Sequence, residues 1–168
     1  ENLTGSEFSD TLAGNDSPNT IDAYDGLVDT VNCAGDTDIA IADEIGVDTV
    51  GSVYRYYFEH RELPPADQIH QYLIDGIGED FLPSCVWWDY IDGIVTIDDK
   101  TAYRATLDLA KQESIFVGSS SGAAAAGARQ VAQELSEDGL VVTLFPDSGE
   151  RYLSKLNKTW LKEKGLLD

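Results

Sequence analysis

The residues with the clearest capacity for chemistry are three consecutive serines between two glycines, at residues 118–122. The run follows the apolar stretch IFV and leads into an Ala-rich segment, so it predicts a turn from a strand into a helix. Three functions suit such a turn. Ser120 fits the pattern G-x-S-x-G, in which a sharp turn exposes a nucleophilic hydroxyl. The glycines also suit a loop that binds a ring or a phosphate at a helix N-terminus, and a serine there can simply cap the helix.

A nucleophilic serine would need a histidine as its base. In the hydrolases that use the G-x-S-x-G turn, the triad runs in the order serine, acid, histidine, so the histidine follows the serine. The chain contains two histidines, His60 and His70, and both precede Ser120. A serine hydroxyl without a base is a poor nucleophile. The sequence therefore favours ligand binding or helix capping over hydrolysis at Ser120.

Charge is distributed unevenly and divides the chain near residue 50. Residues 1–50 contain twelve Asp and Glu and no Lys or Arg, whereas residues 51–168 contain nineteen acids and all eleven bases. We therefore expect two domains with these bounds. The net charge of −20 argues against nucleic acid or an anionic membrane as a partner, because phosphate contacts need clustered bases. No stretch is long and apolar enough for a membrane span.

The remaining sequence-wide features are the cysteines and the first residue. Cys33 and Cys85 lie in dissimilar contexts and form no C-x-x-C pair, so they predict neither a zinc site nor a disulfide framework. The chain starts at Glu1 without a methionine and without a secretory signal, from which we expect further residues upstream.

The acidic segment, residues 1–50, contains a repeat. A polar residue followed by an aliphatic one, in most copies with threonine between them, recurs at spacings of nine or ten residues, and single glycines punctuate the intervals. Short strands that alternate with glycine-containing turns predict a β-roll-like, all-β segment. The segment resembles the repeats-in-toxin family, whose turns bind calcium, and this resemblance implies calcium ligands at Asp10, Asp29 and Asp38. The alternative is an acidic tail that stays disordered because it buries too little apolar area.

Strands and helices are expected to alternate in residues 51–168. The expected strands are residues 94–97, 114–117 and 140–145. The last has no polar alternation, so we expect it to be covered on both faces. The succession of strand, helix, strand, helix and strand predicts an α/β fold with a parallel sheet.

Three helices are expected between and before these strands. A short helix should begin within residues 51–58 and end before the proline pair that follows. A second helix, capped by Asp98 or Asp99, should present one apolar face. The residues of that face are Tyr103, Leu107 and Ala110. A third helix, residues 121–135, is so rich in alanine and glycine that it must pack closely.

Four motifs in this second part occur together in one known family. In chain order they are GSVYRYYF, IDGIGEDFLP, IFVGSSSGAAAAGA and TLFPDSGERYLSKLNKTW. Over about residues 46–168, their order and spacing resemble the C-terminal part of cystathionine β-synthase and cysteine synthase. These are fold-type II enzymes that use pyridoxal phosphate. The resemblance implies a partial three-layer parallel sheet, small amino-acid substrates, and β-replacement or lyase chemistry in sulfur amino-acid metabolism.

The resemblance also implies which residues bind the cofactor. Ser120 would hydrogen-bond the pyridine nitrogen, while Gly76 and Gly78 would let the loop backbone approach the ring without a Cβ clash. Asp147 and Ser148 follow the last expected strand, at the end where open α/β sheets place their ligands. We expect these two residues to support that rim rather than to act as catalytic acids, and capping of the next helix would explain them equally well.

The family's N-terminal half has no counterpart in the sequence. That half supplies the Schiff-base lysine and the loops for the cofactor phosphate and the substrate carboxylate. All six lysines of this chain follow the GIG motif, so none occupies the position of the family's lysine. We therefore expect no catalytic residue and no activity from this chain alone.

Two other functions remain open at this point. One is a calcium-stabilised binding or surface module, and the other is a non-catalytic subunit that pairs with an intact synthase. A sheet lacking its N-terminal strands would expose an apolar face and promote self-association or such pairing. The synthase resemblance suggests a cytoplasmic protein, whereas the repeats suggest secretion.

Overall fold

The computed structural model describes residues 2–6, 10–23, 30–32, 39–41, 43–135 and 139–167. The chain separates into two compact units. The first contains residues 1–46, 87–93 and 130–142, and the second contains residues 47–86, 94–129 and 143–168. Asp29 and Asp38, two of the three expected calcium ligands, lie outside the described residues, as does Cys33.

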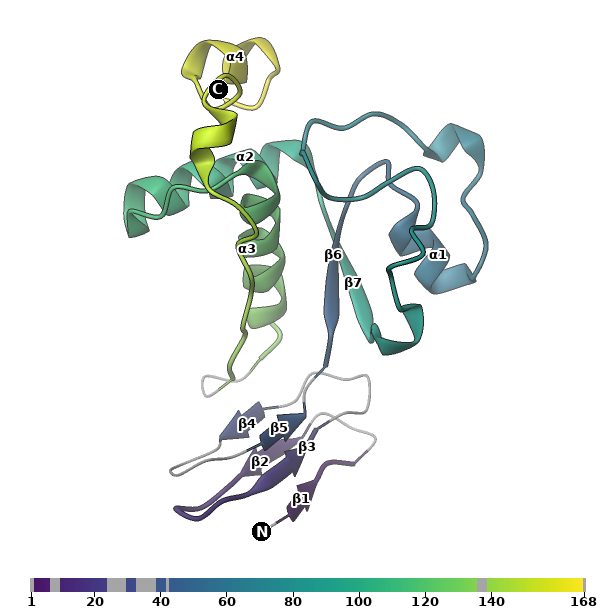
Figure 1. The fold of residues 1–168 in the computed structure, drawn as a ribbon, viewed down its shortest axis with the longest axis vertical. Coiled ribbons are helices and arrows are strands. Elements are labelled where there is room, and N and C mark those ends of the chain that lie inside the picture. The colour runs from purple at the N-terminus through teal and green to yellow at the C-terminus, as the bar shows by residue number, and fades with distance from the viewer. Residues whose placement is uncertain are drawn as a thin grey trace. The chain divides into compact units, whose positions relative to one another are not determined.

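Short parallel strands build the N-terminal part of the first unit (Figure 1). They are β1 (Asn2–Thr4), β2 (Thr11–Ala13), β3 (Thr20–Asp22), β4 (Thr30–Asn32) and β5 (Ile39–Ile41). One sheet contains β1, β3 and β5, and another contains β2 and β4. The register places Leu3 beside Ile21 and Ile21 beside Ala40, so strands two repeats apart are neighbours. Strands are thus present at the positions that the repeat spacing predicts.

Side chains of this segment stabilise its own turns. The Asp10 carboxylate accepts hydrogen bonds from the backbone N–H and the hydroxyl of Ser6. The Asn19 amide donates to the Asn15 carbonyl at 3.1 Å. Across the described part of the chain, no three His, Cys, Asp or Glu side chains are grouped so that they could hold a metal ion. Asp10 thus contacts Ser6, four residues earlier, and belongs to no such group among the described residues.

Two further strands and four α-helices follow. They are β6 (Ile45–Thr49), α1 (Tyr54–His60), β7 (Gly93–Ile97), α2 (Asp99–Asp108), α3 (Ser119–Ala132) and α4 (Lys158–Glu163). A π-helical turn extends α2, and three short 3₁₀ helices lie in the connections. Their bounds are Leu109–Glu113 for the π turn and Ala66–Gln68, Trp88–Tyr90 and Gly149–Tyr152 for the 3₁₀ helices. Among the described helices, none is long and apolar enough to cross a membrane.

The paired strands β6 and β7 carry helices on both sides (Figure 1). On one side lies α3, where a Cβ on Gly127 would come within 2.9 Å of Val47 Cγ2 and 3.0 Å of Val95 Cγ2. Side chains alternate between the faces of a strand, so Asp48 points to the other side. There its carboxylate accepts the backbone N–H of Arg55, in α1, at 2.9 Å. This helix, sheet, helix arrangement is the α/β fold that the sequence predicts.

At the start of α2, the two candidate N-cap residues have different roles. Asp98 is the N-cap, and its carboxylate accepts the N–H of Thr101 at 3.0 Å. The Asp99 side chain instead reaches a loop and accepts the N–H of Leu73 at 2.8 Å. Burial alone would raise the pKa of Asp98, but hydrogen bonds from Thr101 outweigh it and the pKa is lowered. Asp98 therefore stays ionised as the helix cap.

The apolar face predicted for α2 is only partly confirmed. Tyr103 is buried and Leu107 packs against its cluster, as predicted, but Ala110 is exposed. Ala110 lies in the π-helical turn, which has more residues per turn than the α-helix and so shifts the side chains away from the α-helical phase. The residues that α2 buries are Ala102, Tyr103 and Thr106.

Two of the expected strands are wrong. Residues 114–117 contribute only an isolated antiparallel bridge between Val117 and Ser148, and residues 140–145 form no strand. Leu140, Val142 and Leu144 expose 76%, 84% and 79% of their surface, although the apolar run predicts burial. A strand buried on both faces needs neighbouring strands for its backbone and helices for its faces. The described part of the chain supplies neither at residues 140–145.

Candidate functional site

The serine turn, residues 118–121, opens α3 and allows no larger residue at its first position. A Cβ added to Gly118 would lie 2.5 Å from Asp147 Oδ1 and 2.5 Å from Cε2 of the Tyr152 ring. The N–H of Gly122 returns to the Gly118 carbonyl at 3.1 Å and closes the first helical turn. Close packing, rather than a need for unusual dihedrals, therefore explains the glycine at residue 118.

The three serines of this turn are all buried, but their hydroxyls differ. Ser119 Oγ accepts the backbone N–H of Asp75 at 3.2 Å, and Ser121 Oγ donates to Asp147 Oδ1 at 3.4 Å. Ser120 is only 7% exposed, and its hydroxyl has no hydrogen-bond partner among the described residues. A buried hydroxyl normally has a partner. Among the three serines of the turn, Ser120 is the one whose hydroxyl makes no hydrogen bond to the described residues.

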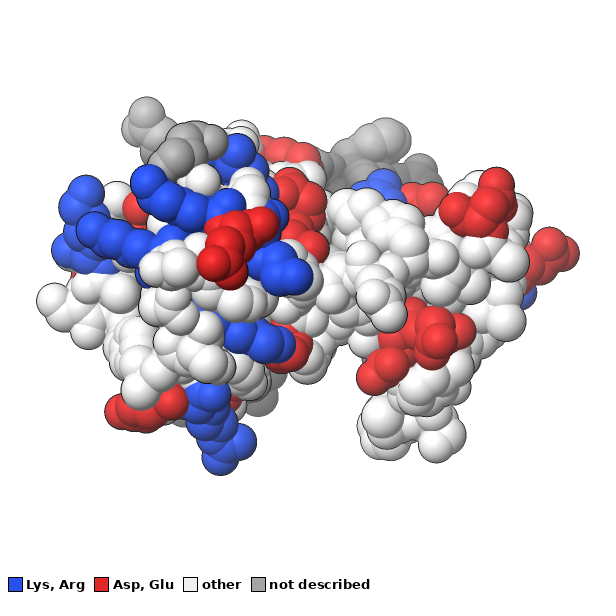
Figure 2. All heavy atoms as spheres, turned by 90° about the horizontal axis from the view of Figure 1, so that it is seen from above, with Lys and Arg blue, Asp and Glu red and all other residues white. Residues whose placement is uncertain are grey.

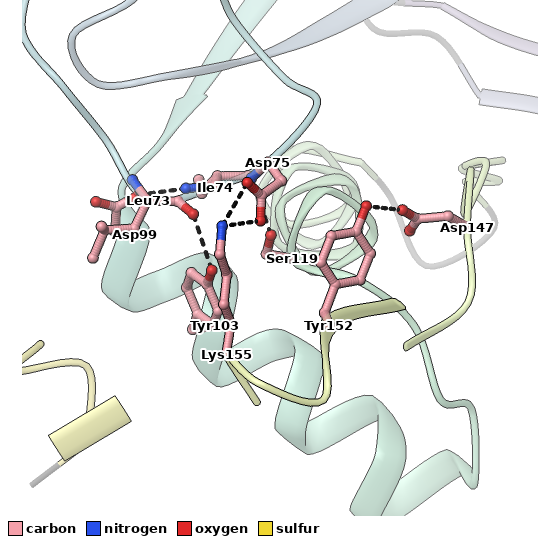
Figure 3. A network of polar contacts seen from close by, with 9 residues as sticks. All are labelled: Leu73, Ile74, Asp75, Asp99, Tyr103, Ser119, Asp147, Tyr152 and Lys155. Atoms are coloured by element: carbon pink, nitrogen blue, oxygen red, sulfur yellow. Dashed lines mark hydrogen bonds and ion pairs between the residues drawn. The ribbon is translucent and has the colours of Figure 1, made fainter. Parts of the chain in front are cut away.

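The glycine loop, residues 74–78, is anchored by α2 at its start (Figure 3). Asp99 Oδ1 accepts the N–H groups of Leu73 and Ile74 at 2.8 and 3.1 Å. From the next turn of α2, the Tyr103 hydroxyl donates to the Leu73 carbonyl at 2.9 Å. Burial raises the pKa of Tyr103 to about 12, so the phenol stays a neutral donor at physiological pH.

Two further elements bind the loop at Asp75. Its backbone N–H donates to Ser119 in α3, and its carboxylate accepts from Lys155 Nζ at 2.7 and 2.6 Å (Figure 3). The segment before Gly76 is thus connected to α2, α3 and the C-terminal region. These contacts bring the glycine loop and the serine turn together.

The two glycines of this loop serve different purposes. Both have positive φ, +74° at Gly76 and +70° at Gly78, a region that side chains disfavour. A Cβ on Gly78 would come within 2.8 Å of Thr49 Cγ2 and Ser52 Cβ, so Gly78 packs against the end of β6. Around Gly76 no atom lies within 4 Å of such a Cβ. Gly76 therefore presents bare backbone to open space beside the serine turn.

Asp147 lies between the serine turn and the 3₁₀ helix Gly149–Tyr152. Its carboxylate accepts from Ser121 and from the Tyr152 hydroxyl. This second bond, together with partial burial, raises the pKa of Tyr152, because the phenol donates to a carboxylate. Ser148 begins the 3₁₀ helix, but its hydroxyl donates to Glu150. Of the two expected rim residues, Asp147 thus contacts the serine turn and Ser148 bonds to its own helix.

Neither histidine supports hydrolysis. His60 is exposed at the end of α1, with its ring centroid 4.3 Å from that of Tyr56. His70 is also exposed and lies against Gly51. The structure places both in contacts away from Ser120, in agreement with the order of the residues in the chain.

The ion pair between Lys155 and Asp75 is the feature that sequence reasoning missed. Lysines and arginines crowd residues 151–164, and Figure 2 shows Lys and Arg side chains gathered on one face with acids among them. Composition alone therefore suggests a solvated, basic end of the chain. The only sequence signal was positional, because Asp75 directly precedes Gly76 and Lys155 belongs to the motif PDSGERYLSK. Nothing in a separation of 80 residues predicts their contact.

The residues present fit a planar heteroaromatic cofactor such as pyridoxal phosphate. The fit rests on the Ser120 hydroxyl, which lacks a protein partner, and on the bare backbone at Gly76. Ser120 would hold a ring nitrogen, and Gly76 would allow the loop to approach the ring.

Comparison with known proteins identifies the family of the chain. The family model described as "Pyridoxal-phosphate dependent enzyme" matches residues 14–147. The match begins inside the acidic segment, upstream of residue 46, where the sequence resemblance was expected to begin. Nothing in the comparisons supports the resemblance to repeats-in-toxin proteins or calcium binding.

Curated relatives carry the names of two related activities. The O-acetylserine dependent cystathionine beta-synthase of Bacillus subtilis is 40% identical over 86 residues, which are 51% of this chain and 28% of that protein. Cysteine synthase of Helicobacter pylori is 48% identical over 82 residues, 49% of this chain and 27% of that protein. Cystathionine beta-synthase of Oryctolagus cuniculus is 37% identical over 125 residues, 74% of this chain and 22% of that protein.

A solved structure extends the likeness to the fold. The crystal structure of O-acetylserine dependent cystathionine beta-synthase from Helicobacter pylori matches with a TM-score of 0.56 and 37% sequence identity. The match covers 68% of this chain and 34% of that one. The chain spans about a quarter of the length of the three curated relatives. Since the family model covers most of its residues, the chain belongs to the family of pyridoxal-phosphate dependent enzymes.

Proposed function

We propose that the second unit contains the ring-binding part of a pyridoxal phosphate site in a β-replacement or lyase enzyme of sulfur amino-acid metabolism. The observation that carries the proposal is Ser120, a residue only 7% exposed at the start of α3 whose hydroxyl has no partner among the described residues, beside a glycine loop of open backbone. The names of the relatives, cystathionine beta-synthase and cysteine synthase, give the reaction class. Both classes act on small amino acids.

Each residue of the site has a stated role in this proposal. Pyridoxal phosphate, when bound, supplies the electron sink for bond cleavage at an amino acid. Ser120 binds the ring nitrogen, and because a hydroxyl is neutral it does not keep that nitrogen protonated as a carboxylate would. Gly76 lets the loop approach the ring. Asp147 orients Ser121 and Tyr152 and thereby supports the turn that carries Ser120.

We further propose that this chain alone is catalytically inactive. The reaction class needs a lysine amine that bonds to the cofactor and moves a proton at the substrate. All six lysines follow the glycine loop in the sequence, and Lys155, which lies at the site, is paired with Asp75. No lysine among those described is thus positioned for this role.

Equilibrium titration with pyridoxal phosphate, followed by its absorbance and fluorescence, tests the ring-binding proposal. Ser120→Ala should weaken binding about threefold to tenfold, the value of one hydrogen bond to a ligand. The matched control is Ser84→Ala, which removes an exposed hydroxyl from the same unit and should leave binding unchanged. Equal affinity of wild type and Ser120→Ala, or no saturable binding by wild type, would refute the proposal.

Calcium binding by the first unit is the alternative function that its acidic repeat suggests, although the described residues contain no side-chain group that could hold a metal ion. Asp10 is the described candidate ligand. If calcium stabilises this segment, millimolar calcium should increase its resistance to protease, and Asp10→Asn should reduce that gain. Identical digestion with calcium and with a chelator would exclude the function.

A further inference from the structure

Three elements hold the residues immediately before Gly76, two through the backbone and one through a side chain. Asp99 and Tyr103 of α2 bind the backbone of Leu73 and Ile74, and Ser119 of α3 accepts the N–H of Asp75. Each of these anchors is a buried or half-buried hydrogen bond. The third element, the C-terminal region, contributes Lys155, which binds the Asp75 side chain and not the backbone. The four side chains Asp99, Tyr103, Ser119 and Lys155 thus all bind residues 73–75, at the start of the glycine loop (Figure 3).

The contact of Lys155 with Asp75 is charged at both ends and easily reached by water. The Nζ atom lies 2.7 and 2.6 Å from the two carboxylate oxygens, and each side chain is 37% exposed. A pair this exposed contributes little to the stability of a whole domain. The same free energy has a larger relative effect on local opening of the glycine loop, because loops open far more readily than whole domains unfold.

The ion pair lies directly before the two glycines of the loop. Asp75 is followed by Gly76 and, two residues later, by Gly78. The backbone beyond the ion pair therefore contains two residues whose dihedrals no side chain restricts. Apart from the chain neighbours of Gly76, no described residue has an atom within 4 Å of a Cβ built on it. The ion pair is therefore the last side-chain restraint before the backbone that faces the ligand space.

We propose that Lys155 is a positioning residue, whose ion pair with Asp75 keeps the glycine loop against the serine turn in the arrangement that binds the cofactor ring. The ligand in this statement rests on the function proposed above, whereas the restraint on the loop does not. Lys155 acts through Asp75 and does not itself contact the ring. The role explains why a lysine of the basic C-terminal region is folded back onto the glycine loop.

Amide hydrogen exchange of the full chain without cofactor tests the restraint. Lys155→Met should accelerate exchange at residues 73–78 by about threefold to tenfold, while the midpoint of thermal unfolding shifts by no more than about 4 °C. The matched control is Lys158→Met, which removes an exposed lysine at the start of α4 and should leave this loop unchanged. Unchanged exchange in Lys155→Met, or a uniform acceleration across the second unit, would overturn the proposal.

Swapping the charges of Asp75 and Lys155 distinguishes the effect of the ion pair from that of packing by the aliphatic part of the lysine side chain. Asp75→Lys alone should open the loop as Lys155→Met does, and the double variant Asp75→Lys with Lys155→Asp should restore most of the protection. High salt should weaken protection in wild type and have no effect in Lys155→Met. Failure of the double variant to restore any protection would overturn the assignment to the ion pair.

Pyridoxal phosphate titration of the same variants tests the link to the cofactor. Lys155→Met should bind more weakly than wild type by about the factor by which the loop opens. If wild type shows no saturable binding, the proposed function fails while the exchange experiment still decides the restraint. If Lys155→Met opens the loop but binds as tightly as wild type, the restraint stands and its role in positioning is refuted.

Discussion

Three adjacent serines at the start of α3 have three roles because a helix turns each successive side chain by about 100°. Ser119 faces the glycine loop, Ser121 faces Asp147, and Ser120 lies between them with its hydroxyl free of protein partners in the described structure. Their neighbours Gly118 and Gly122 are fixed by packing. A change at either glycine would therefore alter the place of the serines as well as the stability of the unit.

The contact of α3 with α2 at Gly122 is the most sensitive packing point. A Cβ there would overlap the Ala102 carbonyl and the Thr106 hydroxyl of α2, whereas a Cβ on Gly127 would meet only valine methyl groups. Gly122→Ala should lower the free energy of unfolding by about 3 kcal/mol, and Gly127→Ala by about 1 kcal/mol, because backbone yields less than methyl groups do. Urea denaturation measures both. Equal costs would show that α2 and α3 can separate freely.

At the residue scale, sequence reasoning found the groups that local rules govern. The glycines of the loop and Ser120 were singled out by turn chemistry and by the family motifs. The sequence limited the N-cap of α2 to Asp98 or Asp99, because capping depends on a few dihedrals near the helix start. Lys155 was missed because its partner is distant in the sequence and its neighbours are other exposed bases.

At the scale of elements, the predictions succeed where an element can be stabilised by its own sequence or by a near neighbour. The helices α1, α2 and α3 and the strand β7 follow from caps, breakers and periodicity. Residues 140–145 have the composition of a buried strand, yet composition does not supply the partners that such a strand needs. Most of these residues are exposed because the described part of this chain does not supply those partners.

The exposed strip at Leu140 and Val142 should promote association of the chain with itself. Exposed apolar residues with unpaired backbone favour intermolecular contacts. Val142→Lys should lower the fraction of oligomer seen in sedimentation velocity, since the side chain is 84% exposed and its loss costs little stability. The control Thr143→Lys adds the same charge at the adjacent exposed residue. Equal effects of the two variants would show that net charge, rather than this strip, governs association.

At the scale of the whole molecule, two units with different chemistry lie in one chain. The first carries short parallel strands in an acidic sequence without bases, and the second carries a helix, sheet, helix arrangement with the glycine loop and the serine turn. Charge alone predicted a single boundary near residue 50, whereas the first unit also includes residues 87–93 and 130–142. The sequence did not predict that the family match would begin at residue 14, because the repeat dominates the local pattern there.

We propose that this chain binds the ring of pyridoxal phosphate and has no lysine placed to bond to it. The most direct test of this proposal is incubation with the cofactor, reduction with borohydride and peptide mapping, with product analysis from serine-type substrates in parallel. The account predicts saturable binding, no single lysine modified in stoichiometric amount, and no cystathionine or cysteine formed. One stoichiometrically modified lysine together with product would contradict it.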